Sequence, residues 1–163
     1  MLFRSALATH AIKASEKMRS QNLQSSNIRV FARTSKYSSQ NYQRSAYRKL
    51  TNATVDTNTI LKIVVELSKE IYNPKYKFSK AGVLMQDLTN SEYSQQSVIK
   101  YKSQEDLKKS TNLMRTIDLL NKKFNKNAIT WAITKKPQSW AMNKNFLSRS
   151  STTDIEQIPT IVK

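Results

Sequence analysis

Arginine and hydroxyl side chains recur along "IRVFARTS", residues 28–35, with an aromatic residue between the two arginines. Successive side chains of a strand point to opposite faces, so Arg29, Phe31 and Arg33 would share one face, and Ile28, Val30 and Ala32 the other. Cations with neutral donors beside them, here Thr34 and Ser35, are what a nucleic-acid backbone binds. The pattern therefore favours a phosphate-binding strand. The alternative is a solvated, charged face on an ordinary half-exposed strand.

The chain contains a single glycine, Gly82, although an average composition would give roughly eleven in a chain of this length. It lies within "YKFSKAGVLMQDL", residues 76–88, which has the apolar content of a strand. A glycine inside a strand marks a bulge or the close approach of another backbone. The alternative is a packing need, where no Cβ would fit against a covering helix. The sequence leaves both explanations open.

The residues that could perform catalysis are scattered along the chain. Two-metal nucleotidyl transfer requires a cluster of carboxylates around Mg²⁺, and the only adjacent acids are Glu105 and Asp106. Those two come at an expected helix start, where a favourable interaction with the helix dipole is the simpler explanation. The chain has one histidine, His10, no cysteine and no glycine-rich phosphate loop. We therefore expect no catalytic activity, no metal site and no cofactor.

The formal net charge of +17 comes from 28 Lys and Arg residues against 11 Asp and Glu residues. Such an excess favours an anionic partner. Nucleic acid is the common partner of such proteins, and an anionic membrane is the rarer one. No apolar run approaches the ~18–20 residues of a membrane span, and we expect no membrane partner.

The N-terminal region has two interpretations. Up to Val55 the only acid is Glu16, and the stretch is rich in arginine and serine. A basic, amphipathic, acid-poor start is typical of a mitochondrial transit peptide. A first domain helix followed by a basic strand has the same composition, so composition does not separate the two.

Apolar periodicity predicts helices, and alternation predicts strands. Either Asp56 or Thr57 can cap the second helix, and Pro74 ends it. Polar residues 21–27 are expected to separate the first helix from the first strand. In chain order the expected elements are a helix at 5–20, strands at 28–35 and 45–53, a helix containing Ile60–Ile71, and one or two strands within 76–88. Strands mixed with helices, without a glycine-rich turn, favour an α+β fold over a doubly wound nucleotide-binding fold.

A second, smaller α+β unit is expected after a polar linker at residues 90–104. Its helix is predicted from an apolar stripe between Leu113 and Phe124, and its strand from the alternation of residues 128–134.

Several segments of the chain resemble segments of one known protein family and occur in the same order. "KASEKMR" (13–19), "FARTS" (31–35), "YKFSKAGVLMQDL" (76–88) and "LMRTIDLLNKKF" (113–124) run colinearly with one family. The chain resembles the C-terminal part of the UmuC family, the catalytic subunits of the bacterial lesion-bypass polymerase called polymerase V, which are Y-family enzymes. The resemblance covers essentially the whole chain, and it favours a domain helix over a transit peptide at the N-terminus.

The resemblance implies a division into three parts. Residues 1–90 would be a little-finger-like DNA-binding domain, with a small mixed or antiparallel sheet and two helices on one face. Residues 91–104 would be a linker, and residues 105–163 a C-terminal accessory domain. The third strand would run beside the nucleic acid and add Lys77, Lys80 and Gly82 to the contacts.

The linker holds a degenerate form of the family's sliding-clamp peptide, Gln-Leu-x-Leu-Phe. Gln95 is kept, while Gln96 replaces the first Leu and Ser97 holds the variable position. Val98 and Ile99 are smaller apolar substitutes, so weak clamp binding is expected.

The palm, fingers and thumb of the family are missing, and with them the metal-binding carboxylates. The expected function is that of a non-catalytic C-terminal fragment of a translesion DNA polymerase, binding the DNA backbone in DNA repair and the SOS response of the bacterial cytoplasm. One alternative is a protein-interaction module for the sliding clamp, a UmuD-type accessory subunit or a recombinase filament. The other is an inactive, truncated relic.

Overall fold

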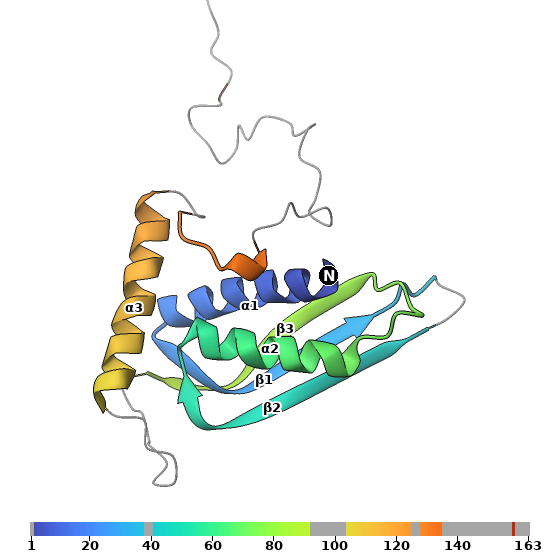
Figure 1. Ribbon diagram of the computed structural model, residues 1–163, viewed down its shortest axis with the longest axis horizontal. Helices are drawn as coiled ribbons and strands as arrows, with labels where there is room; N and C mark the ends of the chain where they lie inside the picture. The colour runs from blue at the N-terminus through green and yellow to red at the C-terminus, as the bar shows by residue number, and fades with distance from the viewer. Residues whose placement is uncertain (1, 38–40, 92–103, 125–127, 135–157, 159–163) are drawn as a thin grey trace, which may run out of the picture.

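The computed structural model describes residues 2–37, 41–91, 104–124, 128–134 and 158. Within them, two long helices cover a three-stranded sheet, and a third helix and one 3₁₀ turn follow (Figure 1). The predicted α+β class is confirmed. In chain order the elements are α1 (Leu2–Ser20), β1 (Leu23–Arg33), β2 (Gln43–Thr54), α2 (Thr57–Ile71), β3 (Lys80–Asn90), α3 (Gln104–Lys123) and η1 (Ala132–Thr134).

The sheet is antiparallel, and its strand order is β2-β1-β3. The central strand is β1, whose Ile28, Val30 and Ala32 are fully buried. Their spacing places all three on one face, because side chains alternate along a strand. The intervening residues of β1 are half-buried on the opposite face.

The helices α1 and α2 lie across one face of the sheet (Figure 1). In the described residues, α1 packs over β1 and β3, and α2 packs over β1 and β2. The core between the two layers consists of Leu7, Ala8, Ala11, Met18, Ile28, Val30, Ala32, Ile60, Leu61, Ile63, Val64, Leu67 and Ile71.

Local signals set the ends of both helices. Asp56 is the N-cap of α2, since its carboxylate accepts hydrogen bonds from the backbone N–H groups of Asn58 and Thr59. This decides between the two predicted caps. At the end of α1, Asn22 adopts a left-handed φ of 55°, a conformation that asparagine tolerates at helix C-termini.

The first strand begins at Leu23, so the prediction of a polar break over residues 21–27 was wrong for all but its first two residues. The strand extends through these polar residues because backbone pairing does not depend on side-chain polarity. Leu23 pairs with Asn90, and the fully buried Ser25 donates its hydroxyl to the carbonyl of Gln86.

Two further strand predictions need correction. A single strand, β3, begins at Lys80, so Tyr76 and Phe78 precede it rather than belong to it. Residues 128–134 form no strand; they end in the 3₁₀ turn η1, closed by a hydrogen bond from Thr134 N to the Trp131 carbonyl. Their alternation reflects the packing of Trp131 and Ile133 against the core.

The predicted helix of the C-terminal unit is present as α3, where Met114 is fully buried. No helix among the described residues is long and apolar enough to cross a membrane.

Candidate nucleic-acid interface

Cross-strand pairing defines the sheet face that the helices leave uncovered. Paired residues of neighbouring strands share a face, and the partners of Arg29, Phe31 and Arg33 therefore lie beside them. The pairing gives four rows of three residues each, and we call these twelve residues the open face. The rows are Asn27, Lys49 and Gln86; Arg29, Tyr47 and Leu84; Phe31, Ser45 and Gly82; and Arg33, Gln43 and Lys80.

The open face is basic. It carries four cations and, among its twelve residues, no acid. None of the four forms an ion pair with another residue in the described part of the chain. The cations are Arg29, Arg33, Lys49 and Lys80.

The covered face of the same sheet differs. Arg48, one residue along from Tyr47, points toward α2 and forms ion pairs with Glu66 at 3.9 Å and Glu70 at 3.3 Å. Acids that balance the sheet's positive charge are therefore on the helical side. The cations of the open face have no acidic partner among the described residues and are available to bind an anion.

The open face also has an aromatic component. Arg29 Cζ lies 5.6 Å from the centroid of the Tyr47 ring, a distance typical of a cation–π contact. The tyrosine is 62% exposed. The contact places the guanidinium beside an exposed aromatic ring of the open face.

Phe31 explains the single glycine of the chain. A Cβ on Gly82 would lie 2.6 Å from Cζ and 2.7 Å from Cε1 of Phe31. The ring therefore occupies the space that a side chain would need. Gly82 faces away from the helices, so the packing need arises from this ring. The covering helix that one of the two sequence explanations required is not involved.

Three polar atoms in the first two rows of this face have no hydrogen-bond partner among the described residues. Asn27 Oδ1, Arg29 Nε and Gln86 Oε1 are buried without a hydrogen bond to any described residue. A buried polar atom left without a partner costs free energy. Rotation of these half-buried side chains would present the unused atoms to a ligand on the face.

The structure brings together four of the seven predicted DNA contacts. Arg29, Arg33, Lys80 and Gly82 lie in adjacent rows of the open face. The other three lie apart from the open face. Lys77 is exposed in the connection ahead of β3.

The two hydroxyl residues after β1 have local partners. Thr34 is buried, and its hydroxyl accepts a hydrogen bond from the backbone N–H of Tyr42. The Ser35 hydroxyl accepts one from the N–H of Tyr37. The predicted clamp peptide, Gln95–Ile99, lies outside the described residues.

Six members of the face were not predicted from the sequence: Asn27, Gln43, Ser45, Lys49, Leu84 and Gln86. The alternation of β2 already contained the signal for Lys49, because that residue lies two positions beyond Tyr47. Asn27 and Gln86 could not be found this way. Their position depends on the register between β1 and β3, and Asn27 falls in the segment that had been taken for a break.

The described residues contain no group of three or more His, Cys, Asp or Glu side chains that could hold a metal ion. The four cations of the open face are suited to bind an anionic surface.

The fold and the open face define a class: a two-layer α+β unit with helices on one side of the sheet and a basic surface on the other. Residues 2–98 match the model of the impB/mucB/samB family C-terminal domain. The chain belongs to this family, as the resemblance had indicated. Residues 111–161 match a further model, a domain of unknown function.

Curated relatives match over most of this chain. It is 33% identical to protein MucB of Escherichia coli over 94% of its length. The identity is 28% to protein ImpB of Salmonella typhimurium over 94%, and 28% to protein UmuC of Salmonella typhimurium strain LT2 over 92%. The chain spans only 36% of the length of each of these relatives.

Proposed function

We propose that the open face binds the sugar–phosphate backbone of duplex DNA without reading its sequence. The observation that carries this proposal is a set of four cations that form no ion pair with any described residue, on a face whose twelve residues include no acid. Such contacts position a protein on the duplex and carry no base information.

The dimensions of the face suit this role. Successive rows on one face of an antiparallel strand are about 6.8 Å apart, so four rows extend over roughly 20 Å. Duplex DNA rises 3.4 Å per base pair along each strand, so the face would follow about six base pairs. Each neutralised phosphate releases condensed counterions, which makes binding strongly salt-dependent.

Within the family, this contact would belong to the C-terminal part of a lesion-bypass polymerase acting in DNA repair and the SOS response of the bacterial cytoplasm. The proposed role of this chain is non-catalytic. Contacts with a sliding clamp, a UmuD-type accessory subunit or a recombinase filament stay predictions.

Fluorescence anisotropy on two unrelated duplexes, at several salt concentrations, tests the proposal. Arg33→Gln should weaken binding to both duplexes equally and flatten the log–log salt slope by about 0.9. The matched control is Lys62→Gln, which removes one exposed cation from α2 on the helical side.

Equal losses in the two variants would mean that only diffuse net charge acts, and the proposed interface would be wrong. Salt-independent or absent DNA binding by the unaltered chain would favour the protein-interaction alternative instead.

A further inference from the structure

The helix α3 contacts the helical layer at one end of the molecule (Figure 1). It lies across the end of α1 and the beginning of α2 (Figure 1). Most of α3 falls within the segment that matches the domain of unknown function, which begins at residue 111. Its contacts therefore show how that segment meets the DNA-binding unit proposed above.

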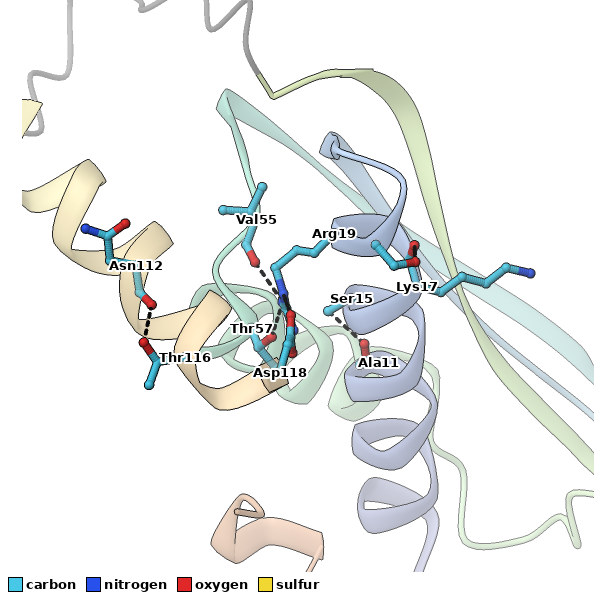
Figure 2. A network of polar contacts seen from close by, with 10 residues as sticks. Ala11, Ser15, Lys17, Arg19, Val55, Thr57, Asn112, Thr116 and Asp118 are labelled. Atoms are coloured by element: carbon cyan, nitrogen blue, oxygen red, sulfur yellow. Dashed lines mark hydrogen bonds and ion pairs between the residues drawn. The ribbon is translucent and has the colours of Figure 1, made fainter. Parts of the chain in front are cut away.

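One arginine joins three parts of the chain (Figure 2). Arg19, in the last turn of α1, donates from Nε to Asp118 Oδ2 at 2.7 Å and from Nη2 to Asp118 Oδ1 at 2.8 Å. Its Nη1 donates to the Val55 carbonyl at 3.0 Å and to Thr57 Oγ1 at 2.7 Å. The guanidinium thus uses four of its five donors to connect α1, the entry to α2 and α3.

This arginine is nearly buried. Its side chain is 7% exposed, and that of Asp118 is 27% exposed. Nη1 lies at the first residue of α2, where the helix dipole is positive and disfavours a cation. The bidentate carboxylate of α3 supplies the compensating negative charge. Removing one partner of such a pair leaves a poorly solvated charge alone, which is strongly unfavourable.

A second contact forms close to the first. Trp131 Nε1 donates to Asn58 Oδ1 at 2.8 Å, and the 3₁₀ turn η1 packs against α1. Asn121 of α3 connects the two contacts, because its amide bonds both the N–H and the carbonyl of Ile129. Residues 128–134 therefore dock together with α3 and beside the same end of α2.

We propose that residues 104–124 and 128–134 form a docking element for the helical layer of the same chain, with Arg19 as its receptor and Asp118 as its principal contact. The first part of the segment that matches the domain of unknown function is thereby anchored to the end of α1 and the start of α2. None of these contacts uses a residue of the open face, so this inference does not depend on the proposed DNA contact.

Hydrogen–deuterium exchange of the full chain, followed by mass spectrometry, tests the docking element. Asp118→Asn should raise the exchange of peptides from α3 and residues 128–134 by about tenfold or more, and leave β1 unchanged. The matched control is Asp106→Asn, which removes an exposed carboxylate from the first turn of the same helix.

Helix propensity cannot produce the same result. Asp and Asn have similar helix propensities, and Asp118 lies outside the last turn of α3, so Asp118→Asn should change the stability of an isolated α3 little. Faster exchange in Asp118→Asn than in Asp106→Asn would therefore report lost docking. Exchange of α3 equal to that of the unaltered chain would overturn the proposal.

Arg19→Gln provides an independent check from the receptor side. It should loosen the same peptides, and combining it with Asp118→Asn should add little, because both changes remove one contact. Fully additive effects would mean that the two residues act separately, and the assignment of Arg19 as receptor would fail. If Arg19→Gln does not fold, the comparison of Asp118→Asn with Asp106→Asn still decides the question.

Discussion

At the level of single residues, Gly82 and Phe31 are complementary. Gly82 has no positive φ, so its backbone would accept alanine, and the obstacle is the Phe31 ring 2.6 Å from the added Cβ. Because the half-buried ring can move toward solvent, we expect Gly82→Ala to lower the free energy of unfolding by only about 1 kcal/mol. In a Phe31→Ala background the same change should be neutral or slightly stabilising.

Urea unfolding of the four proteins in this double-mutant cycle measures the coupling. An equal loss from Gly82→Ala in both backgrounds would show that the ring is not what requires glycine at this position.

His10 makes stability depend on pH. Burial lowers its pKa from 6.5, and the nearby positive charge of Lys13 lowers it further. The unfolded chain therefore binds a proton more readily than the folded one, so His10 reduces stability as pH falls from 6.5 through the lowered pKa. In His10→Gln, the difference in melting temperature between about pH 7.5 and about pH 5.5 should be smaller than in the unaltered chain.

Thermal melts at the two pH values give this difference directly. The reverse order, with a larger pH dependence in His10→Gln, would contradict the assigned direction of the pKa shift.

At the level of elements, α2 depends on its N-cap. The Asp56 carboxylate accepts from the N–H groups of Asn58 and Thr59 at 3.1 Å each, and from the Thr59 hydroxyl at 2.6 Å. Asp56→Ala should lower the free energy of unfolding by about 1–2 kcal/mol, since these backbone donors then lose their acceptor. For a chain of this length, the melting temperature should fall by roughly 2–4 °C per kcal/mol.

Asp56→Asn is the control for this prediction. It keeps an acceptor but removes the charge that favours the helix N-terminus, so its loss should be smaller. Thermal unfolding that ranks Asn below Ala would argue against capping as the source of stability.

At the level of the whole molecule, the two sides of the sheet differ in whether their cations are paired with acids. The helical side carries Glu66 and Glu70, paired with Arg48, and the docking contact of Arg19 with Asp118. The four cations of the open face form no such pair with any described residue. This difference in pairing, and not a difference in net charge, makes the open face the surface available to an anionic partner.

The same charge distribution leads to a prediction about activity. We expect the purified chain to extend no primer with Mg²⁺ or Mn²⁺, because its eleven acids are scattered and two-metal transfer needs clustered carboxylates. The measurement is template-directed incorporation on a primed duplex. Incorporation that is abolished by substitutions within this chain would contradict the prediction.

Sequence alone was sufficient for features that depend on neighbouring residues. Helical periodicity identified α1, α2 and α3, and alternation identified β2 and the arginines that share one face of β1. The N-cap of α2 could be narrowed locally to Asp56 or Thr57, since a capping side chain lies within a few residues of the N–H groups it binds. The resemblance identified the family that residues 2–98 then matched.

Only the tertiary structure decided features that depend on residues far apart in the chain. The register between β1 and β3 placed Gly82 against Phe31 and Asn27 beside Gln86. The same pairing extended β1 back to Leu23 through polar residues. Arg19 and Asp118 are 99 positions apart, and no spacing rule connects them. Side-chain periodicity reports which face a residue occupies, whereas packing between elements determines what that face meets.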